Sequence, residues 1–567
     1  MYRVRRIVWR HYGLRAIRRT YMQATLENNS IVLSFPYPYD PAVIKFIRLL
    51  DGRHFDKLTK TWSVPLSSMT EVNLKNLEKL GFSVSEDIYK ALTSEKQAVE
   101  ELKQLEQAKI AEFSSSLPLY DFQKITAAYM VKAGSCLNAS EVGSGKTITV
   151  LGVCDYLKCR KILVICPKSV MRQWEREIMR WLPSWNIVVV EGNKQTRIEQ
   201  YWKARRQSAP AVLIVSYDLA RIDFNILKDM PRWDAAICDE IHRLGSSGPY
   251  TKTRKAIKQY EAVHRFGLSA TPLRSSLLSY YGIIDFIAPG SLGPWQGFLE
   301  KFTLRNTWGG IWKFINLDEF ASRIRRHMIR KTLAEVGYQL PPLIEEDIIF
   351  DLSEKELEIL NKIKMEILLE LDKIDISKIK DVVSLNFGIV KLGKMQELSD
   401  HLSLIGDHNI SSKLDTLKDH LADTMVNGNK AIVFSRFERM ISILYRELAE
   451  YNPAVITGKI EDRQAQIDKF NSDESCKLCL ITSAGAEGLD LQRANLLYFY
   501  DVPIGSYGQL TQTIGRIKRI GQEKPMVVYY LMASKGVDIP LKKAVAKKGQ
   551  LSERIFDSVA DIREMLM

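Results

Sequence analysis

The chain has 567 residues and a formal net charge of +14, with 46% hydrophobic and 26% charged residues. This ordinary globular composition excludes a chain that is disordered throughout and a collagen-like or mucin-like chain. Its 7 cysteines are too few and too scattered for a disulfide framework, and this favours a reducing, intracellular compartment. The sequence has no run of about 18 apolar residues that would predict a membrane span. The charge favours a polyanionic partner.

The first stretch of the chain is strongly basic. Residues 1–25 carry seven arginines and no acidic residue, so half of the net charge lies there. Three interpretations of residues 1–27 stay open: a nucleic-acid-binding segment, an organelle transit peptide, or a disordered basic tail that includes an over-called start ahead of Met22. The third interpretation is favoured, because a transit peptide is usually richer in serine.

Residues 28–90 predict a small α+β domain. Residues 31–35 form an apolar strand that is ended by the prolines after it, and residues 41–50 carry apolar side chains at helical spacing. Residues 53–65 have the pattern of a short hairpin. The stretch that follows is rich in Glu, Gln, Lys and Ala, and it predicts a solvated helical linker over 91–115.

From about residue 116, short apolar runs alternate with helical patterns. Bare apolar strands of this kind predict a parallel sheet that is covered on both faces. The pattern fills 116–290, gives way over 291–410 to a mostly helical insertion, returns over 411–540, and is followed by a C-terminal helical brace over 541–567. We therefore predict an α/β fold with two parallel-sheet lobes. The strands are expected at 161–166, 187–190, 212–216, 235–238, 266–269, 431–434, 454–456, 478–482, 496–500 and 526–531.

Residues 140–147 carry the sharpest local signal. The phosphate-binding loop (P-loop) pattern is G-x-x-x-x-G-K-[ST], and Gly145, Lys146 and Thr147 match it, whereas Ser140 stands at the first glycine position. Glycines let backbone N–H groups face the phosphates, the lysine places a cation on the β- and γ-phosphates, and the threonine hydroxyl binds Mg²⁺. The sequence therefore predicts a site for a nucleoside triphosphate with Mg²⁺.

Two further patterns follow in order along the chain. The apolar strand at 235–238 ends in Asp239, placed to hold Mg²⁺, and Glu240, placed to take the proton from the attacking water. Arg516 and Arg519 are three residues apart, so on a helix they lie on one face and can reach one phosphate. The residues predicted to act in catalysis are Lys146, Asp239, Glu240, Arg516 and Arg519.

These ordered motifs resemble the superfamily-two helicases and, within them, the Swi/Snf-type DNA translocases. Two positions depart from the family pattern: Ile241 stands where Ala or Gly is usual, and Arg436 where Gln is usual. The resemblance implies two RecA-like lobes with ATP and Mg²⁺ in the cleft between them, and a second lobe that brings the two arginines to the phosphate when the cleft closes. The segments that carry the resemblance are 119–123, 141–147, 166–174, 216–217, 239–242, 268–272, 328–331, 340–342, 433–437, 457–471, 482–492 and 512–522.

The resemblance also implies roles for individual residues. Gln123 would read the adenine of ATP, and Thr147 with Asp239 would hold Mg²⁺. His242 would couple the ATP site to the motif that contains Ser269 and Thr271. The residues implied to bind ATP are Gln123, Glu141, Val142, Gly143, Ser144, Gly145, Lys146, Thr147, Gly488 and Asp490, and those implied to contact DNA are Lys168, Ser169, Ser216, Tyr217, Ser435, Arg436 and Thr482.

Residues 28–90 resemble, less closely, the HARP domain of annealing helicases, which rewind and remodel forked DNA. Lys45, Lys57 and Lys60 would then contact phosphates, and nearby aromatic rings would stack on bases. The alternative is that the aromatic residues form the core of a small unit. The resemblance rests on Phe35, Tyr37, Asp40, Ile44, Phe46, Arg53, Phe55, Asp56 and residues 62–65.

We therefore expect an ATP hydrolase that translocates on double-stranded or forked DNA and acts in DNA repair, recombination or replication-fork remodelling, including annealing or fork regression. The alternatives are a strand-separating or branch-migrating helicase, a non-catalytic DNA clamp and a chromatin remodeller. The intact catalytic residues argue against the clamp. We expect a monomer without a membrane partner, in the cytoplasm or nucleoid of a bacterial or viral source or in the nucleus of a eukaryote.

Overall fold

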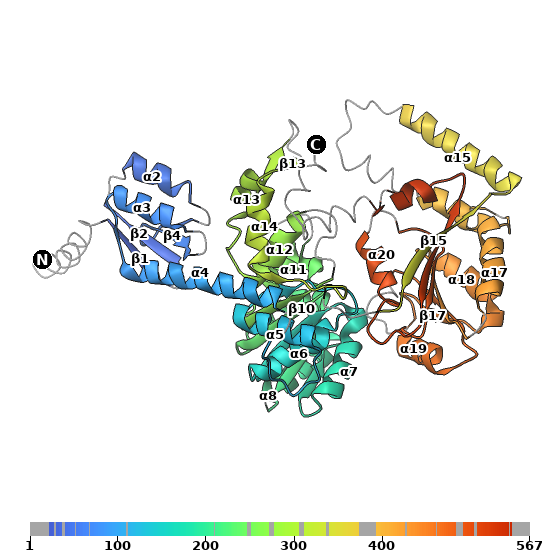
Figure 1. Ribbon diagram of the computed structural model, residues 1–567, viewed down its shortest axis with the longest axis horizontal. Helices are drawn as coiled ribbons and strands as arrows, with labels where there is room; N and C mark the ends of the chain where they lie inside the picture. The colour runs from blue at the N-terminus through green and yellow to red at the C-terminus, as the bar shows by residue number, and fades with distance from the viewer. Residues whose placement is uncertain are drawn as a thin grey trace, which may run out of the picture.

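A computed structural model describes most of residues 22–546, as a small N-terminal unit and two α/β lobes (Figure 1). Residues 1–21 of the predicted basic leader and 547–567 of the predicted brace lie outside the described residues. Within the described range, no helix combines the length and the apolar character that a membrane span requires. The residues inside 22–546 that are not described are 28–29, 37–39, 51–52, 67–68, 109–110, 209, 246–250, 271–276, 306–310, 336–339, 373–392, 407, 426–427, 461, 484–490, 504–506 and 544.

The N-terminal unit is a five-stranded sheet in the order β3-β4-β2-β1-β5. Strand β1 lies in the segment that the sequence assigned to the leader, but it pairs antiparallel with the whole of β2, from Gln23 opposite Ser34 to Glu27 opposite Ser30. The leader prediction is therefore wrong for residues 23–27. These residues form a strand because they pair with β2, and a local pattern does not report this pairing. The elements are β1 (Gln23–Glu27), β2 (Ser30–Ser34), α2 (Pro41–Ile47), β3 (His54–Asp56), β4 (Thr61–Pro65), α3 (Glu71–Lys79), β5 (Ser83–Val84) and α4 (Glu86–Gln107).

Helix α4 joins the N-terminal unit to the first lobe (Figure 1). Ile88 and Leu92, near its start, are buried in the core of the N-terminal unit. Leu102 and Leu105, near its end, pack against the core of the first lobe. The prediction of a solvated linker is therefore incomplete, because apolar side chains near the two ends of the helix anchor it in two different cores.

Lobe 1 is a seven-stranded parallel sheet in the order β14-β6-β11-β10-β7-β9-β8. In β7, Leu163 and Ile165 face one buried cluster, whereas Ile162 and Val164 face the other. Burial on both faces explains why these strands are continuous apolar runs. The elements are α5 (Asp121–Ala133), β6 (Cys136–Asn138), α6 (Lys146–Tyr156), β7 (Lys161–Cys166), α7 (Met171–Trp181), β8 (Asn186–Val189), α8 (Lys194–Arg206), β9 (Ala211–Ser216), α9 (Tyr217–Ile222), α10 (Phe224–Lys228), β10 (Trp233–Asp239), α11 (Lys252–Ile257), β11 (Ala262–Leu268) and α12 (Leu278–Ile287).

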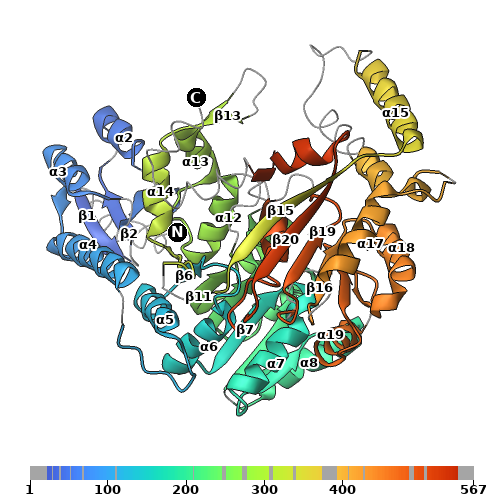
Figure 2. The same ribbon diagram turned by 45° about the vertical axis from the view of Figure 1, so that its right-hand side comes forward.

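The segment between the lobes differs from the mostly helical insertion that the sequence predicts. Its strand β14 joins the sheet of lobe 1 beside β6, and its strand β15 pairs with the whole of β20 at the edge of the sheet of lobe 2 (Figure 2). Both strands need long-range partners, which a local pattern does not report. The elements are α13 (Trp295–Phe302), β12 (Thr303–Arg305), β13 (Ile311–Phe314), α14 (Leu317–Arg325), β14 (Met328–Ile329), β15 (Leu343–Phe350) and α15 (Glu354–Asp372).

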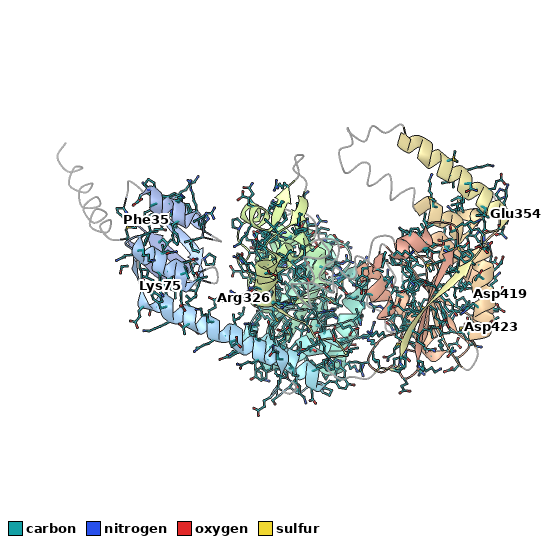
Figure 3. All side chains as sticks on the ribbon, turned by 45° about the horizontal axis from the view of Figure 1, so that its top comes forward. Phe35, Lys75, Arg326, Glu354, Asp419 and Asp423 are labelled. Atoms are coloured by element: carbon teal, nitrogen blue, oxygen red, sulfur yellow. The ribbon has the colours of Figure 1, made fainter. Side chains whose placement is uncertain are left out.

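Lobe 2 is a six-stranded parallel sheet in the order β15-β20-β19-β16-β18-β17. Helix α17 presents Asp419 and Asp423 on its exposed face, where Figure 3 labels them. The parallel-sheet α/β class predicted from the sequence is confirmed for both lobes. The elements are α17 (Ser412–Thr424), β16 (Ala431–Phe434), α18 (Glu438–Glu447), β17 (Ala454–Ile456), α19 (Arg463–Ser472), β18 (Leu478–Ile481), β19 (Leu496–Phe499), α20 (Tyr507–Ile514) and β20 (Met526–Ala533).

A fully buried charge cluster ties three parts of lobe 2 together. Lys413 of α17 donates to Asp400 at 2.8 Å and to Asp538 at 3.1 Å, and all three side chains are completely buried. Burial opposes the charge of Lys413, but the two carboxylates outweigh burial and raise the pKa of the lysine. The hydroxyl of Tyr500 donates to the carbonyl of Asp400. The cluster thus fixes α17 against segments before it and after β20.

Removing the charge of Lys413 is expected to destabilise lobe 2. Lys413→Met keeps an apolar stem but leaves two buried carboxylates without a cation, which should cost about 3–5 kcal/mol of unfolding free energy. The matched control is Lys418→Met on the same helix, whose partly exposed pair with Glu447 should contribute no more than about 1 kcal/mol. Urea-dependent hydrogen exchange of β16 and β19, followed by mass spectrometry, measures the unfolding free energy of lobe 2 in both variants. Equal effects of the two substitutions would contradict the assignment.

Candidate ATP site

The ends of three neighbouring strands bring the predicted ATP-site motifs together. Strand β6 leads into residues 140–147, β10 ends at Asp239, and β11 ends one residue before Ser269. The three strands are adjacent and parallel, in the order β6-β11-β10. Since parallel strands end at the same edge of a sheet, these motifs share one edge of lobe 1.

Two glycines of the P-loop adopt backbone angles that other residues rarely tolerate. Gly143 has a φ of +80° and Gly145 a φ of +75°, and Gly145 directly precedes α6. Ser140 stands where the motif usually has glycine, but its φ is not positive. Its hydroxyl accepts a hydrogen bond from the backbone N–H of Lys331 at 3.2 Å. The serine therefore fits without strain and ties the loop to the segment that leads toward lobe 2.

The ammonium group of Lys146 lies inside the loop that it belongs to. Its Nζ donates to the carbonyl oxygens of Ser140 and Glu141, each at 3.0 Å. The ammonium group, which in this motif would bind the β- and γ-phosphates, is therefore hydrogen-bonded to two backbone carbonyls. Phosphate oxygens would have to replace these carbonyls when a nucleotide binds.

The charges around Lys146 come from both lobes. Burial lowers the pKa of Lys146 to about 8, against the opposing effect of Glu240 and Asp239, and the positive charges of Arg516 and Arg519 lower it further. The side chains predicted to act in catalysis therefore interact electrostatically with one another in the described structure. An anion such as a triphosphate would relieve the repulsion among these three cations.

The two carboxylates of β10 have different environments. Asp239 accepts a hydrogen bond from the indole N–H of Trp174 at 2.9 Å, and burial together with Glu240 raises its pKa to about 6. Burial also acts to raise the pKa of Glu240, but His242 and the cations Lys146 and Arg516 outweigh it, so this pKa is lowered. The lowered pKa favours the ionised carboxylate of Glu240. Its φ of +49° is unusual for a residue with a side chain.

His242 lies between Glu240 and the residue that follows β11, and its coupling role stays a prediction. Its buried Nδ1 lies 3.1 Å from Oε2 of Glu240 and 3.0 Å from Oγ of Ser269, which follows β11. The backbone N–H of Ser269 donates to the carbonyl of Asn138 in β6. A chain of contacts thus runs from Glu240 to the ends of β11 and β6. Thr271, also predicted to couple, lies outside the described residues.

The side chain of Gln123 is hydrogen-bonded to the P-loop. Its side-chain amide donates to the carbonyl of Ser144 at 2.9 Å, and its carbonyl accepts from the backbone N–H of Tyr120 at 3.0 Å. A Cβ on Gly145 would come within 2.3 Å of the amide nitrogen, so this glycine also provides the space that Gln123 fills. The amide that was predicted to read adenine is thus bonded to the phosphate loop in this structure.

The P-loop packs directly against the segment that follows α20 in lobe 2. A Cβ on Gly515 would lie 2.1 Å from the side chain of Val142, and one on Gly143 would lie 3.0 Å from the carbonyl of Lys518. Nζ of Lys518 forms an ion pair with Glu141 at 2.6 Å. Glycines on both sides therefore permit the two lobes to touch at the phosphate loop.

Several residues predicted to contact DNA have their polar groups engaged inside the protein. The hydroxyl of Tyr217 donates to the carbonyl of Asp239, and that of Ser435 donates to Asp501 at 2.6 Å. The guanidinium of Arg436 donates to Gln396. Ser216 and Thr482 are also buried, Ser169 is half-buried and Lys168 is exposed. Contact between these residues and DNA stays a prediction.

The sequence analysis gave no role to Trp174, Asp501 or Lys518, although the first and third lie within the motifs it quoted. Opposite charges at Glu141 and Lys518 could have suggested the ion pair, but only once the two motifs were known to face each other. Asp501 directly follows the strand predicted at 496–500, and this position is the sequence feature that could have marked it as a site residue. Gly488 and Asp490, predicted to bind ATP, lie outside the described residues.

The residues at the P-loop fit a magnesium ion that is held together with a nucleotide. Thr147, the second residue of α6, supplies a hydroxyl, and Asp239 supplies a carboxylate at the end of β10. Mg²⁺ usually takes one or two protein oxygens, and waters and phosphate oxygens complete its coordination. The described residues contain no group of three or more metal-ligating side chains that could hold an ion without the nucleotide.

Comparison with known proteins identifies two domains in the chain. The family model for the SNF2-related domain matches residues 52–401, and the model for the helicase conserved C-terminal domain matches residues 412–521. The first match begins inside the N-terminal unit and runs through lobe 1 and the segment between the lobes. The second match covers most of lobe 2, including the segment with both arginines.

Curated relatives are about a quarter identical to the chain over the aligned residues. The CHD3-type chromatin-remodeling factor PICKLE of Arabidopsis thaliana is 27% identical over 458 residues, which cover 72% of this chain and 32% of that protein. The ISWI chromatin-remodeling complex ATPase ISW2 of Saccharomyces cerevisiae is 25% identical over 446 residues, covering 74% and 39%. The matched part spans between a third and a half of the length of these curated relatives.

A solved structure similar to this chain is the SWI2/SNF2 ATPase core of Sulfolobus solfataricus in complex with dsDNA. It is 22% identical, has a TM-score of 0.39, and covers 81% of this chain and 99% of that chain. The matches to the two domain models carry the assignment, because the first alone covers more than half of the 567 residues. The chain belongs to the SNF2-related family of helicase-like ATPases, with a helicase conserved C-terminal domain as its second lobe.

Proposed function

We propose that this protein is an ATP-dependent translocase on double-stranded DNA whose ATP hydrolysis requires contact between the two lobes. Membership of the family supports ATP hydrolysis by a helicase-like enzyme. The observation that carries the proposal is the convergence of Lys146, Asp239 and Glu240 from lobe 1 with Arg516 and Arg519 from lobe 2. Because the reacting groups belong to two lobes, the rate of hydrolysis depends on the relative position of the lobes. A motor needs this dependence.

Each residue has one task in this proposal. Lys146 exchanges two backbone carbonyls for the β- and γ-phosphates of ATP. Glu240 accepts the proton of the attacking water, and the two arginines of lobe 2 stabilise charge on the transferring phosphoryl group. Thr147 and Asp239 would hold Mg²⁺, and the ion would supply positive charge for the phosphate oxygens of ATP.

DNA is the polymer proposed as the track. The net charge of +14 suits a polyanion, and contacts with phosphates attract duplex DNA without regard to sequence. The exposed Lys168 at the start of the 3-10 turn Lys168–Val170 is the first candidate for such a contact, with Ser169 beside it. The proposed biological setting is repair, recombination or remodelling of replication forks.

The N-terminal unit supports the fork assignment through its surface charge. Lys45, Lys57 and Lys60 are exposed, as phosphate contacts require. Phe46 and Trp62 instead pack against the core of the unit, which favours the packing interpretation of the aromatic residues. The proposed contact of this unit with forked DNA therefore rests on the lysines.

Chromatin remodelling is a second candidate, because the printed names of several curated relatives include it. The strand-separating helicase and the non-catalytic clamp stay as alternatives with specific outcomes. A chromatin remodeller should be stimulated more by nucleosomes than by the same naked DNA. A helicase should release a labelled strand from a partial duplex, and a clamp should bind DNA without hydrolysing ATP.

Glu240→Gln should stop hydrolysis while ATP binding remains. The amide cannot accept the proton, so the DNA-stimulated rate should fall by about 10²–10⁴-fold. The rate is measured with no DNA, single-stranded, duplex and forked DNA, and it should be highest with duplex or forked DNA and vanish with EDTA. Glu261→Gln is the control, because Glu261 directly precedes β11 at the opposite edge of the sheet. A normal rate for Glu240→Gln would exclude Glu240 as the base.

Removing an arginine of lobe 2 should separate binding from hydrolysis. Arg519→Ala should keep nucleotide affinity, which lies mainly on lobe 1, and lose about 10³–10⁵-fold in rate if Arg519 acts as the arginine finger. Arg516→Ala is measured beside it, and the larger loss identifies the finger. Arg446→Ala is the control, because the side chain of Arg446 on α18 is 66% exposed. Unchanged rates for both Arg516→Ala and Arg519→Ala would refute hydrolysis at the lobe contact.

Ser269→Ala should weaken the coupling between the base and the neighbouring strands. Loss of one buried hydrogen bond to His242 is worth about 1 kcal/mol, so the DNA-stimulated rate should fall by about 5–10-fold while ATP affinity stays constant. The control is Ser399→Ala in lobe 2, whose buried hydroxyl donates to the carbonyl of Met395. If Ser399→Ala lowers the stimulated rate equally, the effect belongs to packing and not to coupling.

A further inference from the structure

The hairpin of strands β3 and β4 forms one edge of the N-terminal sheet. The strands pair from His54 opposite Ser63 to Asp56 opposite Thr61, and residues 57–60 make the turn between them. The tip of the turn therefore extends beyond the last paired residues. It carries the sequence Lys-Leu-Thr-Lys.

Leu58, at this tip, is the most exposed of the large apolar side chains in the described residues, with 94% of its surface accessible. A single exposed leucine is common on protein surfaces and needs no explanation by itself. Two further features distinguish this one: the turn that presents it is fixed by hydrogen bonds, and an exposed lysine stands on each side of it.

Asp56 fixes the backbone of the turn. Its Oδ1 accepts hydrogen bonds from the N–H of Leu58 at 2.7 Å and of Thr59 at 3.4 Å, and its carbonyl accepts from the N–H of Lys60 at 2.8 Å. The bond from the N–H of Leu58 is the main reason that the pKa of Asp56 is lowered. Lys60 has a φ of +58°, a conformation that glycine would adopt more easily. The tip thus presents Leu58 in a defined position.

The base of the hairpin is anchored in the core of the unit. The rings of Phe55 and Trp62, directly opposite each other, lie 5.1 Å apart, and Trp62 packs against the core cluster that contains Val64. A load on the tip would therefore be transmitted to the whole N-terminal unit. Packed aromatic pairs across strands stabilise a hairpin in this way.

The N-terminal unit is held to lobe 1 through α4. Lys132 of lobe 1 pairs with Glu101 of α4, and Lys331 donates to the carbonyl of Glu106. Arg326, which Figure 3 labels on the side of lobe 1 toward the N-terminal unit, acts electrostatically on Glu95 of α4. Contacts along the helix therefore couple the position of the hairpin to the motor lobe.

The charge at the tip favours nucleic acid as its partner. Lys57 and Lys60 are exposed, and neither forms an ion pair with a carboxylate in the described part of the chain. Lysines on α4 differ, since Lys96 pairs with Glu71. An apolar side chain between two free cations suits a base step with a phosphate on each side, and proteins that kink DNA insert leucine in this manner.

We propose that Leu58 is a wedge that inserts against the last base pair of a DNA duplex at its junction with single strands, while Lys57 and Lys60 contact the flanking phosphates. The proposal rests on the proposed function, since it takes DNA as the substrate. It adds a residue that separates or holds open the junction as lobe 1 moves. The wedge acts through apolar contact with the face of a base, which every base presents, so it does not depend on base sequence.

The test uses the full chain and a DNA fork with 2-aminopurine in the last base pair, without ATP. Binding of the unsubstituted protein should unstack this base and raise its fluorescence. At saturation, Leu58→Ala should lose most of the rise, by about 3-fold or more, and Leu58→Met should keep it. Leu49→Ala is the matched control, because Leu49 is 73% exposed at the end of α2 in the same unit.

The lysines give an independent reading. The double substitution Lys57→Ala with Lys60→Ala should weaken fork binding and reduce the salt slope by about one unit per lost contact, while the fluorescence rise at saturation remains. An undiminished rise with Leu58→Ala, or an equal loss with Leu49→Ala, would overturn the wedge and leave the tip as a surface for another partner. The fluorescence test needs no hydrolysis. Absence of DNA-stimulated ATPase would therefore refute the translocase, and the fluorescence result would still decide the wedge.

Discussion

The contact between the P-loop and the segment after α20 is the constraint on which the rest of the structure depends. Gly515 leaves room for Val142, and Gly143 leaves room for the backbone around Lys518. Without these glycines the lobes could not approach closely enough for cations of lobe 2 to act on Lys146. Charged residues of both lobes thus act on Lys146 only when the lobes touch, and under the proposed function this condition makes ATP hydrolysis respond to movement of either lobe.

The same constraint explains the chemistry within lobe 1. Nδ1 of His242 contacts both Glu240 and Ser269, so Glu240 is connected to the residue that follows β11. Ser140 ties the P-loop to Lys331 in the segment that leads to the second lobe. Under the proposed function, these two connections are the paths through which bound DNA would act on Glu240.

The sequence predicted most strands of the two sheets well because these strands depend on a local signal. Strands buried on both faces are continuous apolar runs, as in 161–166, and the site residues directly follow such strands. Strands β1 and β15 were not predicted, since each is defined by a partner elsewhere in the chain. The three consecutive acidic residues of β15, Glu345, Glu346 and Asp347, interrupt its apolar pattern and hide it further. For the same reason the bond of Gln123 to the P-loop and the Glu141–Lys518 pair required the folded structure.

Strand β15 has a consequence for how the protein can be divided. It precedes α15 and the predicted start of the second lobe at residue 411, yet it covers the whole edge of β20, from Met526 to Ala533. A fragment that began at residue 411 would expose eight residues of unpaired backbone on a long apolar strand. Such an edge invites pairing with another chain. The second lobe is therefore a self-contained folding unit only when it begins before Leu343, and a fragment cut at the helicase domain boundary would tend to aggregate.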